Sequence, residues 1–302
     1  MFARVVIVGV GLIGGSFALG LKRAGLAGRI VGLGRSAQAL ARARELGIID
    51  EACATPQEAM RGADLVLLAA PVAQTGPILA SLLPHLEPQT IVTDAGSTKS
   101  DVVAAARAAL GEKIAQFVPG HPIAGRESNG PDAAIPDLYR GKKTVLAPLP
   151  ENAPAIVERV AAAWRACGAI IHMLTPQEHD KVFAAVSHLP HLLAYALVDD
   201  IANKPHADLL FQYAASGFRD FTRIAASSPE MWRDISLANR DALLGELDAY
   251  LAQLTHLRAR LAAGDGAALE ATYANAQRAR RAWTEAIEAA EPPPRPDQES
   301  GK

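Results

Sequence analysis

The sequence has little cysteine and no excess of positive charge. Its 302 residues include two cysteines, Cys53 and Cys167, which lack the CxxC or other short spacing of a metal or redox motif. They are typical of small buried apolar residues in a reducing compartment. The formal net charge is −2, so no broad basic surface attracts nucleic acid or an anionic membrane. These absences exclude a disulfide scaffold and argue against nucleic acid as a partner.

Charged residues are also absent from residues 5–21. Signal peptides and membrane spans contain such runs, but this one has five glycines and no A-x-A-like cleavage pattern. At 17 residues it is also marginal for crossing a bilayer. We therefore expect a cytoplasmic protein that does not associate with a membrane. The 302 residues are enough for about two domains.

What the uncharged run does contain is a glycine motif, within VVIVGVGLIGGS. Gly9, Gly11 and Gly14 have GxGxxG spacing, in which glycine permits a tight turn, the approach of a pyrophosphate and close helix packing. The motif lies between a predicted strand, Val5–Val8, and a predicted helix, Leu12–Leu26. We expect it to bind a dinucleotide at the start of this helix. The alternative is a glycine-rich turn in a non-binding α/β domain.

The residue after the second predicted strand, Arg29–Leu33, distinguishes NAD from NADP. An Asp or Glu there binds the ribose hydroxyls of NAD and repels a 2′-phosphate. Here the position is Gly34, and Arg35 and Ser36 come next. A guanidinium and a hydroxyl suit a phosphate dianion, so we expect NADP to be preferred over NAD. The alternative is that Arg35 is a solvated loop charge and Ser36 caps the next helix.

Strands and helices continue to alternate up to residue 173. This order is typical of a Rossmann-type, doubly wound α/β sheet, which we assign to residues 1–173. The further predicted strands are Asp64–Ala70, Thr90–Asp94, Gln116–Gly120, Thr144–Ala147 and Ala169–Met173, and the further helices are Ala37–Leu46, Thr75–Leu83, Ser100–Leu110 and Ala153–Ala166. Ligands bind beyond the carboxyl ends of such strands. The candidate site residues after strand ends are therefore Ser97, Lys99, His121, Arg126 and Glu127.

No strand pattern appears after Met173. The sequence TPQE at 175–178 has the form of a capping box with proline at the first helical position. It predicts a helix to about Asn203 with a kink at Pro190. Further helices are predicted over Asp208–Ala226, Pro229–Ala263 and Ala267–Ala290. We expect residues 174–290 to form an all-α domain whose apolar faces make a homodimer, and the Pro-rich tail 291–302 to be disordered.

Five ordered segments resemble a known family. They are GVGLIGGS near the start, TDAGSTK at 93–99, HPIAGRESNG at 121–130, SHLPH at 187–191 and SGFRDFTRIAASSPEMWRDI at 216–235. They resemble the prephenate and arogenate dehydrogenases, over residues 1 to about 290. The resemblance implies oxidation of a cyclohexadienol by NAD(P), coupled to decarboxylation, in tyrosine biosynthesis. We take prephenate as the expected substrate and arogenate as the alternative.

The resemblance assigns catalytic roles to His121 and Ser97. A neutral imidazole at His121 would accept a hydrogen bond from the ring hydroxyl while hydride leaves the same carbon. Ser97 would link this histidine to the nicotinamide and fix its tautomer, because a hydroxyl donates and accepts at once. The alternatives are a histidine on a surface turn and a serine that caps a helix. Asp94, in the same motif as Ser97, is predicted to be structural.

The resemblance also implies a substrate site shared by the two domains. Arg223 would bind a substrate carboxylate through two parallel hydrogen bonds, and the apolar residues Phe221 and Ile224 beside it predict partial burial. His188 would face the substrate, and its alternative is a core histidine. We expect His121 and Arg223 to face each other across one crevice.

Further residues complete the predicted site. Glu127 would lie near the substrate entrance, and Trp232 and Asp220 would line or brace the pocket, or else serve in packing and capping. Arg126 departs from the family, which often has a small or polar residue there. His191 has no acidic or cysteine partner spaced for a metal, so we predict no metal site. The predicted cofactor contacts are Gly9, Gly11, Leu12, Ile13, Gly14, Arg35, Ser36, Pro71, Val72 and Ser97.

Two other functions are the alternatives. Another β-hydroxyacid or imine dehydrogenase would use a catalytic lysine at the start of the helical domain, where the nearest candidate is Lys181. A nucleotide-sensing regulator would bind NADP without turnover. The presence of His121, Ser97 and Arg223 in one chain argues against the regulator.

Overall fold

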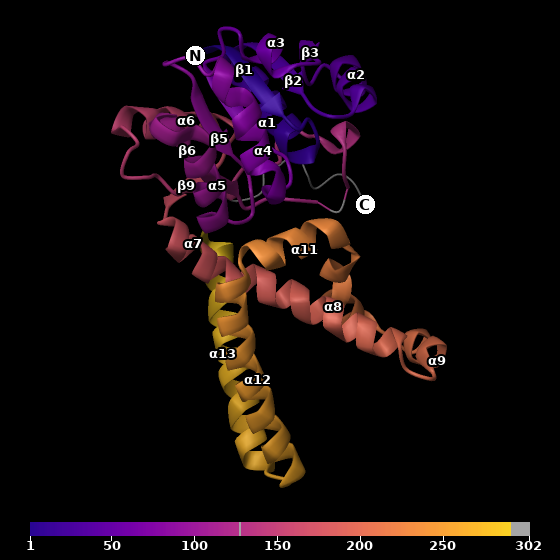
Figure 1. Cartoon of the computed structure of the whole chain (residues 1–302). Coiled ribbons are helices and arrows are strands. Elements are labelled where there is room, and N and C mark those ends of the chain that lie inside the picture. The colour runs from indigo at the N-terminus through magenta and orange to yellow at the C-terminus, as the bar shows by residue number, and fades with distance from the viewer. Residues whose placement is uncertain (127, 291–302) are drawn as a thin grey trace. The chain divides into compact units, whose positions relative to one another are not determined.

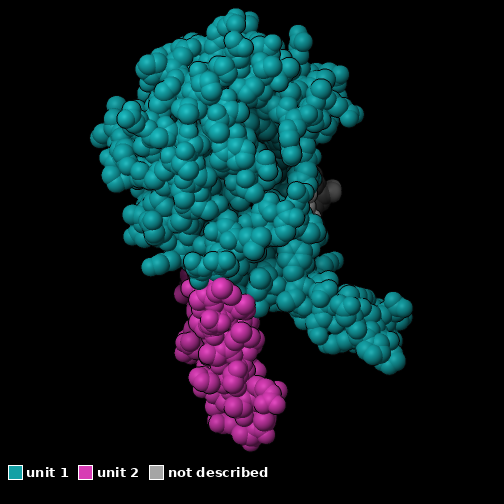
Figure 2. Space-filling view, viewed as in Figure 1, with its two compact units in different colours: residues 1–243 teal, residues 244–302 magenta. Residues whose placement is uncertain are grey.

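The computed structural model of the chain describes residues 1–126 and 128–290. Glu127 and the predicted disordered tail, residues 291–302, lie outside the described residues. Contacts within the chain define two compact units, residues 1–243 and 244–302, which are coloured separately in Figure 2. The first unit holds the sheets and the helices up to α11 (Pro229–Ala238). It therefore carries all the predicted site residues that the structure describes.

A six-stranded parallel sheet lies at the centre of the first unit, drawn in indigo and purple in Figure 1. Its strands are β1 (Phe2–Val8), β2 (Ala27–Leu33), β3 (Glu51–Cys53), β4 (Leu65–Leu68), β5 (Ile91–Asp94) and β6 (Phe117–Val118). Their order in the sheet is β3-β2-β1-β4-β5-β6. The order reverses between β1 and β4, which creates the crevice where doubly wound sheets bind nucleotides. The predicted Rossmann-type fold is confirmed.

Apolar side chains on both faces of β1 explain why the sheet is covered by helices on two sides. Val5 and Ile7 pack into a core with Phe17 and Trp164, whereas Val6 and Val8 pack into a second core with Leu79 and Val102. The helices of this half are α1 (Leu12–Arg23), α2 (Ala37–Glu45), α3 (Pro56–Met60), α4 (Thr75–Leu82), α5 (Ser100–Leu110) and α6 (Pro154–Ala166). Short 3₁₀ turns are η1 (Val72–Gln74), η2 (Leu83–His85), η3 (Gly111–Gln116) and η4 (Pro131–Ala133). Two short elements, β3 and α3, were not predicted from the sequence.

A second, three-stranded sheet corrects the prediction for residues 116–173. It contains β7 (Gly120–Pro122), β8 (Lys143–Leu146) and β9 (Ile170–Met173), with β7 antiparallel to β8. The single strand predicted over Gln116–Gly120 is therefore wrong, because the chain leaves the first sheet at Pro119. Proline cannot donate to a strand ladder, and the next amide, of Gly120, donates to the carboxylate of Asp94 instead. As a result His121 lies within a short strand and not after a strand end.

In the part that the structure describes, the chain after Met173 contains helices and the loops between them and no strand, as predicted. Its elements are α7 (Pro176–Phe183), a π-helix (Ala184–His188), α8 (Leu189–Ala202), α9 (Ala207–Gln212), α10 (Ser216–Thr222), the 3₁₀ turn η6 (Arg223–Ala226), α11, α12 (Arg240–Ala262) and α13 (Gly266–Ala290). The predicted capping box of Thr175 and Glu178 is present. Pro176–Ala202 is long and apolar enough to pass a length-and-composition test for a membrane span, a test that core helices of soluble proteins also pass.

Three of the predicted helices of this half are interrupted. A π-helical turn, and not a simple kink, precedes Pro190, and the amide of Leu189 bonds the carbonyl of Ala184 five residues back. The predicted helix Asp208–Ala226 divides into α9, α10 and η6. The predicted helix from Pro229 to Ala263 is interrupted at Asn239, whose buried side chain hydrogen-bonds groups on α7 and the π-helix.

Candidate active site

The turn between β1 and α1 forms part of a cavity of about 550 Å³. The cavity is lined by residues that follow the carboxyl ends of β1, β2 and β4, together with the loop at Gly130 and Pro131. Its position is the one at which a doubly wound sheet binds a dinucleotide. From the predicted cofactor contacts it includes Gly9, Gly11, Arg35 and Ser36.

The three glycines of the turn meet different surroundings. A Cβ atom on Gly9 would lie 2.5 Å from the carbonyl oxygen of Ala69, and one on Gly14 would come closer still to the carbonyl oxygen of Gly9. A Cβ on Gly11 would meet no described atom within 4 Å. Gly11 precedes α1, and no side chain among the described residues caps that helix start. The open space and the available amides fit a pyrophosphate group.

The residues after β2 match both interpretations of their role. Ser36 accepts a hydrogen bond from the amide of Ala39 at 3.1 Å, so it caps α2. Together with Gly34 and the exposed Arg35, it also lines the cavity. No carboxylate occupies the position of Gly34, where it would face a ribose. Whether Arg35 contacts a cofactor phosphate stays a prediction.

Four further residues were predicted as cofactor contacts, and their placement differs. Leu12 and Val72 are buried in the two cores, Ile13 is half-buried, and Pro71 is exposed. The carbonyl oxygen of Ile13 accepts a hydrogen bond from the hydroxyl of Tyr139 at 2.6 Å. Their contact with a cofactor stays a prediction.

The backbone around His121 is held by β8 and by Asp94 at the end of β5. His121 lies on β7, opposite Val145 of β8, and the amide of Gly120 before it donates to Asp94 Oδ1 at 2.9 Å. A Cβ on Gly120 would lie 2.9 Å from the carbonyl oxygen of Asp94, so only glycine permits this approach of β7 to β5. The backbone of His121 is thereby fixed next to the carboxyl end of β5.

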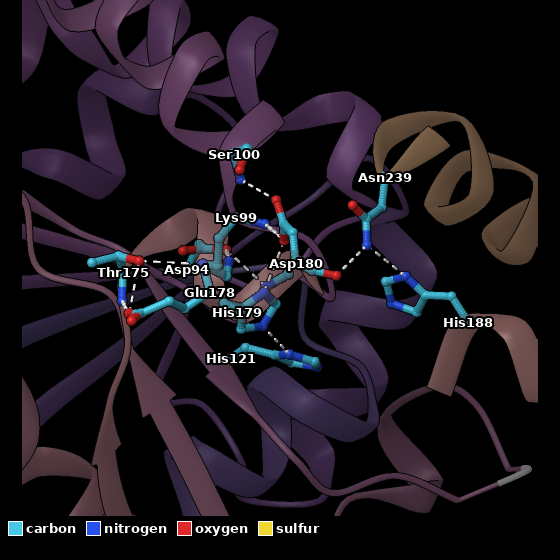
Figure 3. Close-up of polar contacts among 11 residues, drawn as sticks. Asp94, Lys99, Ser100, His121, Thr175, Glu178, His179, Asp180, His188 and Asn239 are labelled. Carbon is cyan, nitrogen blue, oxygen red and sulfur yellow. Dashed lines mark hydrogen bonds and ion pairs between the residues drawn. The ribbon is translucent and has the colours of Figure 1, made fainter. Parts of the chain in front are cut away.

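The imidazole of His121 pairs with a second histidine that sequence analysis did not predict. Its Nδ1 lies 2.8 Å from Nε2 of His179 on α7, and His179 Nδ1 lies 2.8 Å from Asp180 Oδ1 (Figure 3). Phe183 packs against both rings, at 4.9 Å from His121 and 4.5 Å from His179 between ring centroids. Burial lowers the pKa of His121 well below its usual range, and the nearby His179 and Lys99 lower it further. His121 is therefore a neutral imidazole near pH 7.

Asp180 joins the two histidines to the start of α5. Its Oδ1 accepts the amide of Lys99 at 2.8 Å and its Oδ2 accepts the amide of Ser100 at 2.7 Å. Burial alone would raise the pKa of Asp180, but hydrogen bonds from His179, Ser100 and Lys99 outweigh it and lower the pKa. Asp180 is thus a carboxylate that caps a helix N-terminus, where negative charge is stabilised.

A buried ion pair holds the same region. Lys99 Nζ lies 2.5 Å from Asp94 Oδ2, and both side chains are almost fully buried. The other oxygen of Asp94 is the acceptor for Gly120, and Oδ2 also accepts the amide of Gly96. Removing one partner of such a pair leaves a buried charge without compensation. The expectation that Asp94 is structural agrees with these contacts.

His188 is buried, at 1% exposure, and braces α7 and α11 against each other. Its Nδ1 lies 3.0 Å from Nδ2 of Asn239, which also donates to the carbonyl oxygen of Asp180 at 2.8 Å. Burial lowers its pKa to about 4, and His179 contributes to the shift, whereas a hydrogen bond to the backbone of Ser97 opposes it. Both contacts tie His188 to protein groups, and its role in facing a substrate stays a prediction. So does the role predicted for the half-buried Ser97.

Arg223 lies close enough to His191 for its charge to act on that ring. Its charge lowers the pKa of His191, for which burial is the main cause. The His191 ring stacks on Trp232 with 3.5 Å between centroids, and its Nδ1 lies 2.9 Å from the carbonyl oxygen of Ser187. Arg223 is exposed in the single chain and Phe221 is 53% exposed, so the predicted partial burial of Arg223 is wrong. Of its apolar neighbours, Phe221 lies on α10 and Ile224, on the 3₁₀ turn, is half-buried.

Sequence reasoning missed His179, Asp180 and Asn239, and considered His191 only as a metal ligand. We call the set His121, His179, Asp180, His188 and Asn239 the histidine cluster (Figure 3). The sequence carries no distinct signal for His179 and Asp180, because they lie in the polar run TPQEHDK at 175–181, where a solvated helix start is the ordinary interpretation. Among the described residues no group of three or more His, Cys, Asp or Glu side chains is arranged to hold a metal ion.

Family models match both halves of the chain. The prephenate dehydrogenase nucleotide-binding domain matches residues 17–173, and the prephenate dehydrogenase dimerization domain matches residues 175–275. A cyclohexadienyl dehydrogenase of Zymomonas mobilis is 37% identical over 284 residues, which are 93% of this chain and 96% of that protein. A prephenate dehydrogenase of Bacillus subtilis is 36% identical over 256 residues, 84% of this chain and 69% of that protein.

Solved structures agree with these matches. The prephenate dehydrogenase of A. aeolicus in complex with hydroxyphenyl propionate and NAD+ is 36% identical, with a TM-score of 0.84, and the match covers 96% of this chain and 99% of that one. An arogenate dehydrogenase of Synechocystis is 30% identical, with a TM-score of 0.79 and coverage of 93% and 99%. The chain belongs to the prephenate dehydrogenase family of NAD-dependent oxidoreductases.

Proposed function

We propose that this chain catalyses the oxidative decarboxylation of prephenate to 4-hydroxyphenylpyruvate, with transfer of hydride to NAD(P), in tyrosine biosynthesis. The observation that carries the proposal is the state of His121. Its imidazole is neutral because burial lowers its pKa, and one nitrogen is engaged by His179, which leaves the other as the hydrogen-bond partner for a ligand. Loss of hydride from a carbon that bears a hydroxyl requires such an acceptor.

The reaction needs no strong base. Hydride leaves ring carbon 4 with both electrons of its C–H bond, and the ring carboxylate leaves carbon 1 as carbon dioxide. The electron pair of that C–C bond completes the aromatic ring, and the hydroxyl proton stays on the phenol oxygen of the product. His121 accepts the hydroxyl hydrogen bond and so stabilises the positive charge that develops as hydride departs. The remaining task of the protein is orientation, which can lower a barrier by about 7–11 kcal/mol.

The cavity at the start of α1 supports the cofactor assignment. NAD(P) supplies the hydride acceptor when it is bound. Gly9, Gly11 and the amides of α1 would hold its pyrophosphate, and Gly34 and Arg35 would accommodate a 2′-phosphate. We therefore propose NADP as the preferred form, with NAD as the alternative.

The organisation of the chain follows the two matched models. We propose that residues 1–173 form the nucleotide-binding domain and residues 174–290 the helical domain, which the break between the models at residues 173 and 175 supports. We also propose a cytoplasmic homodimer formed through the helical domain. The description of the second model as a dimerization domain supports this, as do exposed apolar side chains on and after α9: Leu209, Phe211 and Tyr213.

The deciding experiment measures kcat/KM for the four combinations of prephenate or arogenate with NADP or NAD. We expect the highest value for prephenate with NADP. A higher value for arogenate would establish the alternative substrate. Binding of NADP without its reduction by either substrate would contradict the proposal and favour a nucleotide-sensing regulator.

Arg223 provides a separate test of the substrate site. We expect Arg223→Ala to raise the apparent KM for prephenate by about 10- to 100-fold, because a charge-assisted pair with a carboxylate contributes about 1.5–3 kcal/mol. The cofactor Kd stays within twofold or so in this variant. Arg219→Ala, four residues earlier on α10, is the matched control, and an unchanged KM in Arg223→Ala would remove the anchoring role.

A further inference from the structure

Neither the family motifs nor the reaction chemistry assigns a role to His179 or Asp180 of the histidine cluster. Both are buried, and both sit on α7, in the helical half of the chain. His179 faces His121, which lies on β7 of the nucleotide-binding half, and Asp180 contacts the other nitrogen of the His179 ring (Figure 3). Because Nε2 of His179 contacts Nδ1 of His121 at 2.8 Å, the second ring acts directly on the first.

Each hydrogen bond in this line has one possible direction. Asp180 is a carboxylate, which only accepts, so His179 Nδ1 must carry the hydrogen that lies between them. His179 is neutral, since burial lowers its pKa and Lys99 adds to the effect against the opposing contribution of Asp180. A neutral ring with hydrogen on Nδ1 has an acceptor at Nε2. His121 Nδ1 must therefore donate, and its own Nε2 is left with a lone pair.

We propose that His179 and Asp180 are positioning residues that fix the tautomer and the direction of His121, with hydrogen on Nδ1 and the acceptor Nε2 directed to the substrate hydroxyl. The proposal rests on the proposed function for the role of His121. A histidine of the opposite tautomer would present an N–H to the substrate hydroxyl and could not accept a hydrogen bond from that hydroxyl. In serine proteases an analogous error of tautomer lowers kcat by about 10⁴-fold.

The surroundings of the two rings support a fixed arrangement. Phe183, one turn after His179, packs against both imidazoles. Asp180 is itself held by the two amides at the start of α5 and cannot rotate away without uncapping that helix. Asn239 fixes the carbonyl oxygen of the same residue. Both carboxylate oxygens of Asp180 and both ring nitrogens of His179 thus have hydrogen-bond partners.

The first test reads the tautomer without turnover. In protein labelled with ¹⁵N histidine, the signals of His121 are identified by their loss in His121→Asn. We expect His121 Nδ1 to be the protonated nitrogen and Nε2 the unprotonated one near pH 7, and His179→Leu to abolish this preference. A wild-type His121 with its hydrogen on Nε2 would overturn the proposal.

The second test compares two substitutions at the same position. His179→Leu removes the acceptor and should lower kcat by about 100- to 10,000-fold while KM and the cofactor Kd change little. His179→Gln retains an amide oxygen that can accept from His121 Nδ1, and should recover most of the kcat that leucine loses. His172→Leu, an exposed histidine on β9, is the control that keeps full activity. Equal losses in the two His179 variants would indicate a packing role and contradict the proposal.

The pH profile separates positioning from packing. The titratable groups that face His121 come from α7, from the loop before α5 and from the π-helix: His179, Lys99 and His188. His179 lowers the pKa of His121, so its removal should move the acid limb of kcat/KM to higher pH. An acid limb unchanged in His179→Gln and His179→Leu would contradict the proposal. If His121→Asn were active, the proposed function would fail; if only the His179 variants were normal, the positioning role alone would fail.

Discussion

Most residues that line the cavity at the start of α1 are glycine or have small side chains, and the glycine turn of this cavity is contiguous in sequence. The histidine cluster instead joins residues that are 58 and 51 positions apart, as in the pairs His121–His179 and His188–Asn239. The cavity tolerates no side chain where the backbone must approach, whereas the cluster requires particular side chains in particular protonation states. The difference teaches that the glycine turn of the proposed cofactor site depends on local chain geometry, whereas the histidine cluster depends on tertiary packing.

The strongest test of this comparison removes the proposed catalytic imidazole from the cluster and leaves the cavity alone. We expect His121→Asn to lower kcat by about 10²- to 10⁴-fold, because the hydroxyl loses its neutral acceptor. The NADP Kd, measured by fluorescence quenching or calorimetry, stays close to the wild-type value. Near-normal turnover in this variant would show that the cluster does not carry the reaction.

A second effect is confined to the cluster and concerns stability. In the unfolded chain His188 titrates near 6.5, whereas in the fold burial lowers its pKa to about 4. The unfolded state binds more protons between these values, so the stability that neutral His188 contributes is complete above about pH 6.5 and is lost as pH falls towards 4. The shift corresponds to about 3 kcal/mol. His121 and His179 act in the same direction.

Urea unfolding at a series of pH values measures this dependence. We expect the free energy of unfolding to fall from about pH 6.5 to pH 4, and His188→Gln to reduce the slope. The exposed His172 provides a control variant, His172→Gln, that leaves the slope as it is. A slope that is the same in His188→Gln would mean that His188 does not titrate with folding.

A pair of substitutions in the glycine turn addresses the other side of the comparison. Gly14→Ala places a methyl group against the carbonyl oxygen of Gly9. Overpacking of this kind costs about 1–3 kcal/mol. Because alanine is favoured over glycine in a helix by only about 1 kcal/mol, the substitution should destabilise the fold. Gly11→Ala meets no described atom within 4 Å, so it should fold nearly normally. Its methyl group instead enters the space that a pyrophosphate needs.

Two measurements on these variants keep stability and binding apart. Gly14→Ala should lower the melting temperature, and Gly11→Ala should raise the NADP Kd by about tenfold or more with little change in melting temperature. Identical binding of NADP to Gly11→Ala and wild type would show that the cofactor does not use this turn.

The same contrast explains what the sequence could and could not predict. The glycine turn and the capping box of Thr175 and Glu178 depend on residues within a few positions of one another, and both were found. The change of sheet at Pro119 was missed, because the strand pattern continues through it and the cause, capture of the Gly120 amide by Asp94, lies 26 residues away. A run of apolar residues does not specify which sheet it joins.

The members of the histidine cluster that were predicted from the sequence, His121 and His188, are those that lie in a family motif. His121 was found through its motif, but His179 and Asp180 acquire their meaning from β7 and from the start of α5, which no spacing in the sequence brings together. Asn239 reads as an ordinary position in a long helix until its side chain is seen to bond Asp180 and His188, which ends α11. Buried polar residues of this kind need a partner to be stable, and the partner is a property of the fold.

The smallest expected effect lies at the rim of the cavity, where local geometry alone again predicts the outcome. Arg35 lines the cavity next to Gly34, where an acid would otherwise face the ribose. Arg35→Ala should raise the NADP Kd by about tenfold, which corresponds to about 1.4 kcal/mol, the order expected for a partly screened contact between a guanidinium and a phosphate. The NAD Kd should change little, since NAD lacks the 2′-phosphate. Arg44→Ala on α2 is the matched control, because Arg44 is likewise exposed but does not line this cavity. Equal effects of Arg35→Ala on NADP and NAD would mean that the charge steers dinucleotides in general, and the preference would then have to come from the backbone around Gly34.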